Sequence, residues 1–166
     1  HQNEIDGFKE LNEIFHAGVT PYYVSLMNLT DPDNVCPVRL QGLPRVEELK
    51  DKVGVPDPLL EEEHYPVKEV VHVYPDRVAF CVAQLCPVYC RYCYRKRRDE
   101  EVGLHFNRTI LDRGIEYIAK NKAIRDVLIT GGDPFIASDQ AIENLLTRIR
   151  AIPHVEIIRF GTRTPV

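Results

Sequence analysis

No stretch of this 166-residue sequence approaches the ~20 consecutive apolar residues that a membrane-spanning helix needs. The first ten residues, HQNEIDGFKE, also lack the basic and apolar regions of a secretory signal peptide. These two absences predict a cytoplasmic protein. An initiator methionine is missing as well, and the sequence stops abruptly at Thr164-Pro165-Val166, so we expect this chain to be part of a longer one.

An excess of positive charge is also absent. The formal net charge of -4 gives no electrostatic reason to expect a nucleic acid or an anionic membrane as partner. A secreted disulfide framework is not indicated either, because three of the five cysteines fall within eight consecutive residues. Of the other two, Cys81 lies in an apolar run and is predicted to be buried, and Cys36 has no assigned role. With 44% hydrophobic residues, the chain has enough apolar material for one substantial core.

Residues 1–70 are predicted to form a helical and loop-rich N-terminal region. Apolar residues recur at spacings of three and four over 5–16, which predicts an amphipathic helix. Thr20 and Pro21 suit the N-cap and first turn of a second helix ending near Met27. The remaining expectations are a mostly loop segment over 28–44, a short helix over 46–53 and a solvated acidic run over 61–63.

Residues 71–166 show the alternation of an α/β core. Nearly continuous apolar runs predict three buried strands, and apolar residues at helical spacing predict two helices. The strands are expected over 78–83, 126–130 and 155–160, and the helices over 110–118 and 142–149. Ser138 or Asp139 can cap the second helix. This order predicts a parallel sheet with right-handed crossovers. In such folds the functional site is formed by the loops that follow the carboxyl ends of the strands.

Cys86, Cys90 and Cys93 follow the first of these strands at spacings of four and three. Soft sulfur ligands at this spacing favour zinc or an iron-sulfur cluster. A structural zinc site requires a fourth protein ligand, whereas a cube of four irons held by three thiolates leaves one iron open for a substrate. His64 and His72 are candidate fourth ligands, but neither has the spacing of common zinc motifs. The other interpretations are a redox pair of Cys90 and Cys93, and three buried cysteines without a ligand.

The cysteine spacing, with an aromatic residue before the last ligand, resembles the cluster-binding signature of the radical S-adenosylmethionine (SAM) superfamily. The resemblance implies a [4Fe-4S] cluster whose open iron binds SAM, and one electron that cleaves SAM to a 5′-deoxyadenosyl radical. It also implies that Tyr92 contacts the adenine and that Gly131-Gly132-Asp133 receives the SAM amino group. The implied fold is the first half of a partial (βα) barrel, with three βα units in residues 71–166 after a helical N-terminal appendage.

Further segments of the chain resemble landmarks of the lysine 2,3-aminomutase family. They include Thr20-Pro21-Tyr22-Tyr23, Asp57-Pro58-Leu59, Tyr74-Pro75-Asp76-Arg77-Val78, residues 86–98 and Gly161-Thr162-Arg163-Thr164-Pro165-Val166. This family uses pyridoxal 5′-phosphate (PLP) to carry an amino group between neighbouring carbons of an amino acid. The resemblance implies that Arg95 pairs with the substrate carboxylate, which suits a planar guanidinium, and that Arg77 contacts the PLP phosphate. At Val73 the family commonly has arginine, so one cationic contact to the phosphate is missing.

The resemblance also implies a reduced ferredoxin or flavodoxin as electron donor, and it leaves this fragment without a catalytic residue, because the lysine that binds PLP belongs beyond Val166. The family barrel has more βα units than the three visible here, so the third strand is expected to present an unpaired edge. The rest of the chain, another domain or a second copy in a homo-oligomer would cover it. Two alternatives are a truncated, non-catalytic relative that binds a metal structurally, and a radical SAM enzyme without PLP.

Overall fold

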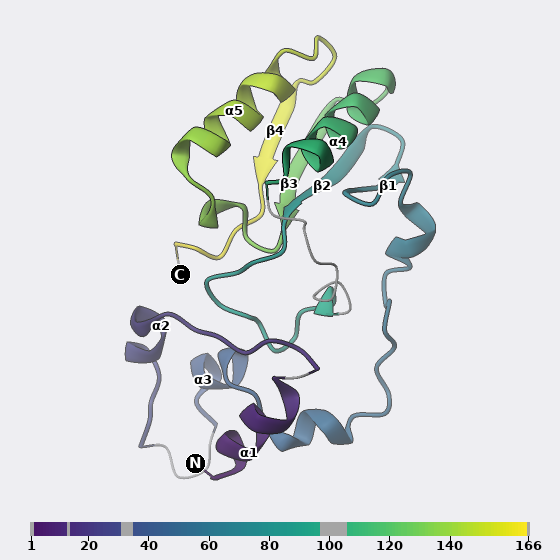
Figure 1. The fold of residues 1–166 in the computed structure, drawn as a ribbon. Helices are drawn as coiled ribbons and strands as arrows, with labels where there is room; N and C mark the ends of the chain where they lie inside the picture. Colours follow the sequence, from purple (N-terminus) through teal and green to yellow (C-terminus); the bar gives the residue numbers. More distant parts are fainter. Residues whose placement is uncertain (1, 13, 31–34, 97–105, 166) are drawn as a thin grey trace. The chain divides into compact units, whose positions relative to one another are not determined.

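The computed structural model describes residues 2–12, 14–30, 35–96 and 106–165 (Figure 1). The chain divides into two compact units. The N-terminal unit comprises His1–Pro58 and Pro87–Glu100, and the sheet unit comprises Leu59–Cys86 and Glu101–Pro165. The cysteine segment therefore starts at the end of one unit and continues in the other. The predicted division into residues 1–70 and 71–166 stays a prediction.

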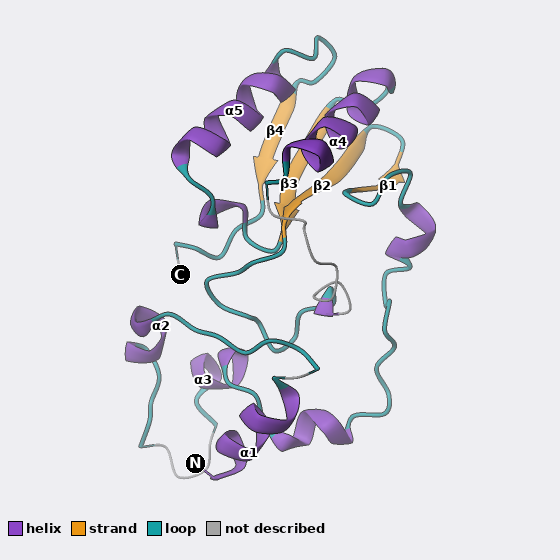
Figure 2. Cartoon of the chain, in the orientation of Figure 1, coloured by secondary structure: helices purple, strands orange, loops and turns teal. Residues whose placement is uncertain are grey.

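A four-stranded sheet in the order β1-β2-β3-β4 forms the centre of the sheet unit (Figure 2). Its strands are β1 (Val70–Tyr74), β2 (Arg77–Ala83), β3 (Asp126–Gly131) and β4 (Ile157–Phe160). β2, β3 and β4 are parallel neighbours, as the apolar runs predict, while β1 pairs antiparallel with β2. The α/β class is thus confirmed with a mixed sheet, and the partial barrel stays a prediction.

β1 is the strand that the sequence analysis does not predict. It forms a hairpin with β2, in which Tyr74 is the partner of Arg77 across Pro75 and Asp76. Proline presets the φ angle and aspartate accepts local hydrogen bonds, so this pair suits a tight turn. Only the first two residues of β1 are buried, and the strand therefore lacks the long apolar run that marks β2.

Two long helices cover one face of the sheet (Figures 1 and 2). α4 (Arg108–Lys120) connects β2 to β3, and α5 (Asp139–Arg150) connects β3 to β4. Ser138 caps α5 as predicted, because its hydroxyl accepts a hydrogen bond from Ala141 N at 3.3 Å. Successive right-handed crossovers that step in one direction across a sheet place their helices on the same face.

The core between the helices and the sheet is apolar. Its fully buried side chains include Phe80, Ile118, Ile129, Leu145 and Ile149. Burying a side chain of this size contributes roughly 1.5–3 kcal/mol. α4 approaches β2 closely at Gly114, where an added Cβ would lie 2.3 Å from the Phe80 ring. Cys81 is 1% exposed, which confirms its predicted burial.

Short helices make up the N-terminal unit. They are α1 (Gln2–Leu11), α2 (Pro21–Ser25), α3 (Pro37–Gly42) and a 3₁₀ turn over Val46–Lys50. α2 begins as predicted, with the Thr20 hydroxyl accepting a hydrogen bond from Tyr23 N at 3.1 Å. The prediction of mostly loop over 28–44 missed α3, which Pro37 opens at a position where its missing N–H costs nothing. α1 is shorter than expected, and the third predicted helix is a single 3₁₀ turn.

The acidic run 61–63 lies in a 3₁₀ turn, Glu61–His64, of the sheet unit. The prediction that this run is solvated is wrong for Glu61, which is 4% exposed and accepts a hydrogen bond from the Tyr65 hydroxyl at 3.3 Å. Glu62 and Glu63 are exposed, as predicted. Within the described residues, no helix is long and apolar enough to cross a membrane.

A buried ion pair joins α1 to α3. Nε and Nη2 of Arg39 both donate to the Glu4 carboxylate, and the two side chains are only 4% and 11% exposed. Burial alone would raise the pKa of Glu4, but the hydrogen bonds and charge of Arg39 hold this pKa below its ordinary value. The carboxylate therefore stays ionised in the folded state at a pH where the unfolded chain protonates it.

We expect the Glu4→Gln variant to be less stable than the wild type near neutral pH, with a smaller difference in acid. A carboxyl whose folded-state pKa is depressed adds stability above its unfolded pKa, and this stability is lost as pH falls through the folded-state value. The measurement is the free energy of unfolding in urea between about pH 7 and pH 3. Glu10→Gln changes an exposed glutamate of the same helix and should show neither effect. A Glu4→Gln deficit that stays constant with pH would contradict this expectation.

Candidate metal centre

Three cysteines lie on the segment that leaves β2. Cys86 belongs to the sheet unit, whereas Cys90 and Cys93 belong to the N-terminal unit. All three are partly buried, and none of them forms a disulfide. Cys90 and Cys93 share one turn, in which Cys93 N donates to Cys90 O at 3.0 Å. Two of the three predicted ligands are therefore held together by local backbone structure.

The two histidines considered as zinc ligands lie in the sheet unit. His72 on β1 shares a hydrogen bond between its Nδ1 and the Tyr117 hydroxyl at 2.7 Å, and His64 ends a 3₁₀ turn. Over the ranges that the structure describes, no three histidine, cysteine or carboxylate side chains gather closely enough to hold a metal ion. His72 therefore has a partner in α4 rather than in the cysteine segment.

The donor chemistry of the cysteine segment fits an iron-sulfur cluster. Burial raises the pKa of the Cys93 thiol, and the Arg95 amide with the cations of Arg95 and Lys96 offsets only part of this rise. A metal ligand has to be the thiolate, so metal binding at Cys93 releases a proton. Thiolates close together on a loop select zinc or iron-sulfur centres over hard cations. Cys86, Cys90 and Cys93 are thus suited to hold such a group.

Residues between the cysteines fasten the segment to the N-terminal unit. Val88 is 4% exposed and packs in an apolar cluster with Tyr23. Tyr89 N donates to Gly18 O at 2.9 Å, and the Tyr89 ring meets the Phe15 ring edge-on at 6.0 Å between centroids. The turn that carries Cys90 and Cys93 is therefore preceded by residues packed against a defined apolar layer.

Arg91 is the buried cation of this segment. Its Nε and Nη2 donate to the Glu48 carboxylate at 3.0 and 2.9 Å, and its Nη1 donates to His16 O at 3.1 Å. Arg91 N donates to Gln41 O at 2.9 Å. Sequence reasoning missed these partners. The only signal for Glu48 was general: an arginine in a partly buried loop requires a carboxylate.

The loop after β3 lies against the chain that leads into the cysteine segment. Gly131 has φ = 126°, which favours glycine, and an added Cβ would lie 2.3 Å from Ala83 O. Gly132 N donates to Ala83 O at 2.5 Å, and Asp133 N donates to Leu85 O at 2.8 Å. The structure therefore places the Gly-Gly-Asp motif beside the residues that immediately precede Cys86.

The Asp133 carboxylate joins the loops that follow β3 and β4. Its Oδ1 accepts hydrogen bonds from the Thr162 hydroxyl at 2.6 Å and from Phe135 N at 3.0 Å. Its Oδ2 accepts from Arg163 N at 2.7 Å and from Thr164 N at 3.1 Å. Asp133 is 3% exposed, and four accepted hydrogen bonds fill the usual capacity of a carboxylate. A ligand at this loop would therefore meet its main chain rather than the Asp133 side chain.

Tyr92 and Arg95 flank Cys93 in the N-terminal unit. Tyr92 is 64% exposed, and the Arg95 guanidinium lies over the Tyr94 ring at 4.9 Å. The structure thus keeps both residues on the same short segment as two of the cysteines. Their roles toward adenine and toward a substrate carboxylate stay predictions.

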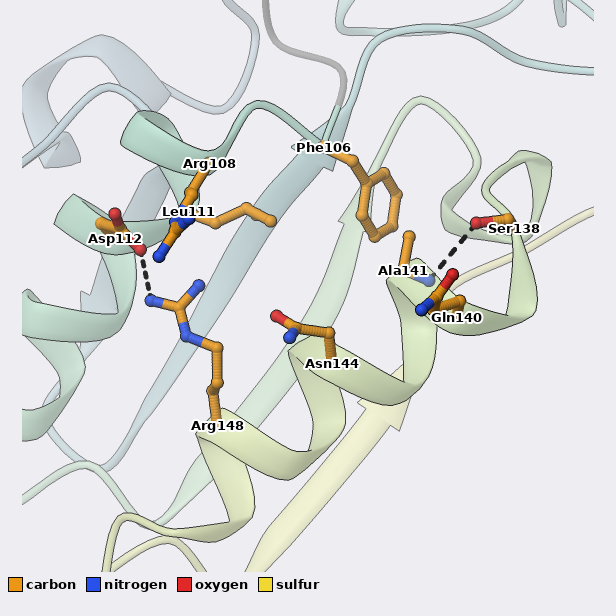
Figure 3. Close-up of a pocket in the computed structure, with 9 residues that line it drawn as sticks. All are labelled: Phe106, Arg108, Leu111, Asp112, Ser138, Gln140, Ala141, Asn144 and Arg148. Carbon is orange, nitrogen blue, oxygen red and sulfur yellow. Dashed lines mark hydrogen bonds and ion pairs between the residues drawn. The ribbon is translucent and has the colours of Figure 1, made fainter.

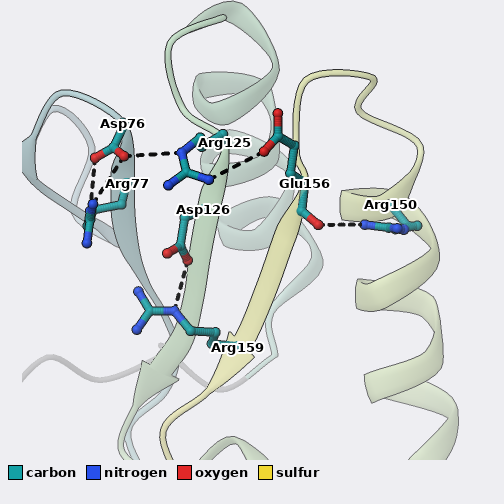
Figure 4. Close-up of polar contacts among 7 residues, drawn as sticks. All are labelled: Asp76, Arg77, Arg125, Asp126, Arg150, Glu156 and Arg159. Carbon is teal, nitrogen blue, oxygen red and sulfur yellow. Dashed lines mark hydrogen bonds and ion pairs between the residues drawn. The ribbon is translucent and has the colours of Figure 1, made fainter.

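Arg77 lies at the opposite end of the sheet from the Gly-Gly-Asp motif. At the amino end of β2, Arg77 is the partner of Asp126, whereas Ala83 at the carboxyl end is the partner of Gly131. The Arg77 guanidinium donates to Asp76 at 2.9 and 3.1 Å, which lowers the pKa of Asp76 (Figure 4). Within the sheet unit, Arg77 is therefore separated from the Gly-Gly-Asp motif by the length of β2, and its contact with PLP stays a prediction.

Further ion pairs connect the amino ends of the strands (Figure 4). Arg125 donates to Asp76 at 3.3 Å and to Glu156 at 3.4 Å, so it links the β1-β2 turn to the residue before β4. Arg159 on β4 donates to Asp126 on β3 at 2.9 Å. Arg77, Arg125 and Arg159 therefore each form an ion pair with a carboxylate of the sheet unit.

A cleft of about 570 Å³ lies between the amino-terminal half of α4 and the length of α5 (Figure 3). Arg148 of α5 forms an ion pair with Asp112 of α4 across it, and Phe106 contributes to its wall. No predicted site residue lines this cleft. The cleft therefore belongs to the helix layer and not to the cysteine segment.

The family model described as a 4Fe-4S single cluster domain matches residues 76–162, more than half of the chain. This span includes the three parallel strands, all three cysteines and the Gly-Gly-Asp loop. The chain therefore belongs to the family of 4Fe-4S single cluster domains.

Nearly the whole chain is similar in sequence to several 2,3-aminomutases. Over 99% of its length the chain is 46% identical to the L-lysine 2,3-aminomutase of Bacillus subtilis (strain 168) and 41% identical to that of Fusobacterium nucleatum. It is 38% identical, again over 99% of its length, to the glutamate 2,3-aminomutase of Clostridioides difficile (strain 630). The chain spans 35%, 39% and 39% of these three proteins. The predicted resemblance to the lysine 2,3-aminomutase family is thereby confirmed over nearly the whole chain.

We expect Asp133→Asn to loosen the loop over 161–164. An amide nitrogen cannot accept the hydrogen bonds that a carboxylate oxygen accepts, so two donors lose their partner at a cost of about 1–3 kcal/mol. Hydrogen-deuterium exchange should therefore speed up roughly tenfold at the amides of Arg163 and Thr164. Asp139→Asn makes the same change at an exposed residue of α5 and should leave these amides unchanged. Equal exchange in the two variants would show that Asp133 does not hold the loop.

Proposed function

We propose that this chain is the cluster-binding and SAM-binding part of a radical SAM 2,3-aminomutase. In this proposal, reductive cleavage of SAM starts the 1,2-migration of an amino group on an amino acid. The proposal is carried by the 46% identity to an L-lysine 2,3-aminomutase over 99% of the chain. Since the chain spans 35% of that relative, the proposed activity is that of a longer protein.

In the proposed site, Cys86, Cys90 and Cys93 hold the cluster as thiolates. The cluster, when bound, supplies the electron that cleaves SAM. We assign the SAM amino group to the main chain of Gly131 and Gly132, because the Asp133 carboxylate already accepts four hydrogen bonds. Tyr92 is assigned to the adenine, which its exposed ring supports.

The proposed substrate is an amino acid, free or protein-bound, whose carboxylate pairs with Arg95. Two relatives named for lysine are 46% and 41% identical to this chain, and one named for glutamate is 38% identical. Overall identities of this size do not separate the two substrates. The proposed electron donor is a reduced ferredoxin or flavodoxin, the donor class that the resemblance implies.

PLP completes the proposal as the group that carries the migrating nitrogen. Arg77, whose guanidinium also pairs with Asp76, is its proposed phosphate contact in this chain. We assign the lysine that binds PLP to the part of the longer protein outside this chain. Binding of PLP to the full-length protein, measured by its absorption, tests this assignment separately from the cluster.

Anaerobic reconstitution of the full-length protein with iron and sulfide should load about four irons per chain. Reduction in the presence of SAM should then release 5′-deoxyadenosine and methionine. Cys90→Ala should abolish loading with little change in helix content, because only a thiolate ligand is removed. Cys36→Ala is the matched control: its Sγ accepts a hydrogen bond from Asn28 N at 3.3 Å in the same unit, and its loss should leave loading intact.

Different results would support the alternatives. One zinc per chain without sulfide would favour a non-catalytic relative, and SAM cleavage by a full-length protein that binds no PLP would favour a radical SAM enzyme of another type. Failure of the full-length protein both to load the cluster and to cleave SAM would refute the proposed function.

A further inference from the structure

One buried charge lies between two of the proposed cluster ligands. Arg91 directly follows Cys90 and comes two residues before Cys93, and its side chain is 5% exposed. Nε and Nη2 form forked hydrogen bonds with the Glu48 carboxylate at 3.0 and 2.9 Å, and Nη1 donates to His16 O at 3.1 Å. Each guanidinium nitrogen is therefore bound to the N-terminal unit.

Glu48 is itself fixed by its own backbone. Its Oε1 accepts a hydrogen bond from Arg45 N at 3.2 Å, at the start of the 3₁₀ turn. The same Oε1 receives Arg91 Nε. The carboxylate is thus oriented toward Arg91 by a local interaction within residues 45–48.

A second cation of the segment lies near the same carboxylate. Lys96 Nζ is 3.6 Å from Glu48 Oε2. Arg91 and Lys96 also lie over the Phe15 ring, at 4.9 and 5.4 Å from its centroid. Glu48 therefore contacts cations on both sides of Cys93 in the sequence.

We propose that Glu48 is a positioning residue for the cluster and that, through Arg91, it also sets how readily the cluster accepts an electron. This inference rests on the proposed function, because it assigns the role at the same cysteine segment. Its first part is mechanical: the ion pair holds the turn of Cys90 and Cys93. Its second part is electrostatic: the Glu48 charge compensates the Arg91 charge.

Both the mechanical and the electrostatic role of Glu48 follow from the burial of the Arg91 side chain. A guanidinium left buried without its carboxylate is costly, so loss of the Glu48 charge favours loop conformations in which Arg91 reaches water. Loss of this negative charge also makes the surroundings of the cluster more positive. Positive surroundings favour the reduced state, which carries one more electron, so the reduction potential should rise.

The Glu48→Gln variant keeps the shape of the side chain and removes its charge. In the full-length reconstituted protein, we expect about a tenfold increase in the equilibrium constant for cluster reduction, or about 59 mV for one electron. Glu47→Gln is the matched control. It removes the same charge from the neighbouring residue, which pairs with Arg45 at 3.3 Å and has a side chain 52% exposed. Its potential and iron content should equal those of the wild type.

Two further measurements separate the two parts of the inference. Arg91→Met should lower the potential, and the double variant with Glu48→Gln, which has neither charge, should return it toward the wild-type value. In the metal-free protein, amide exchange over 88–93 reports the loop without the cluster. This exchange should become faster in Glu48→Gln and stay unchanged in Glu47→Gln.

The outcomes are distinct. A wild-type protein that loads no cluster would refute the proposed function and this inference with it. A wild-type protein that loads the cluster, together with a Glu48→Gln variant of unchanged potential and unchanged exchange, would overturn the inference alone. Faster exchange at an unchanged potential would overturn it as well, because Glu48 would then only hold the loop.

Discussion

A guanidinium taken out of water requires a carboxylate, and this requirement governs the cysteine segment. Arg91 meets it with Glu48, a residue 43 positions earlier in the chain. The segment therefore reaches its observed conformation only when the N-terminal unit supplies that carboxylate together with the carbonyls of His16 and Gln41. The helices of the N-terminal unit are for this reason part of the candidate site, although the resemblance described them only as an appendage that precedes it.

In the sheet unit the buried charges are carboxylates, and these require hydrogen-bond donors. Its buried carboxylates each have donors: Asp133 accepts from the loops after β3 and β4, and Glu69, which is fully buried, accepts from Arg113 at 3.1 and 3.3 Å. At the opposite end of the strands, Arg125 spans from Asp76 to Glu156. At the carboxyl ends of the strands, the Asp133 carboxylate joins two loops by accepting hydrogen bonds from them. At the amino ends, the Arg125 guanidinium joins two segments by donating to the carboxylates of Asp76 and Glu156. The Asp133 side chain therefore serves to join the loops after β3 and β4.

The parallel strands and both long helices could be predicted because each is one apolar segment with the period of its own structure and a local cap such as Ser138. β1 and α3 could not, since their burial depends on partners elsewhere in the chain. The cysteines were visible as a spacing, but Glu48 was not, because an ion pair across 43 residues leaves no local mark. Glu61 is an error of the opposite kind: the acidic run 61–63 predicted an exposed side chain, but Glu61 is buried.

The antiparallel hairpin decides on which side the sheet can grow. β1 already occupies the outer edge of β2 from Arg77 to Phe80, so that edge has no hydrogen-bonding groups left for a parallel neighbour along this length. On this side, the parallel part of the sheet therefore ends at β2, and its neighbour runs in the opposite direction. On the other side, β4 is the last strand in the order of the sheet among the described residues. The two edge strands thus differ in kind: β1 belongs to an antiparallel hairpin, whereas β4 belongs to the parallel series.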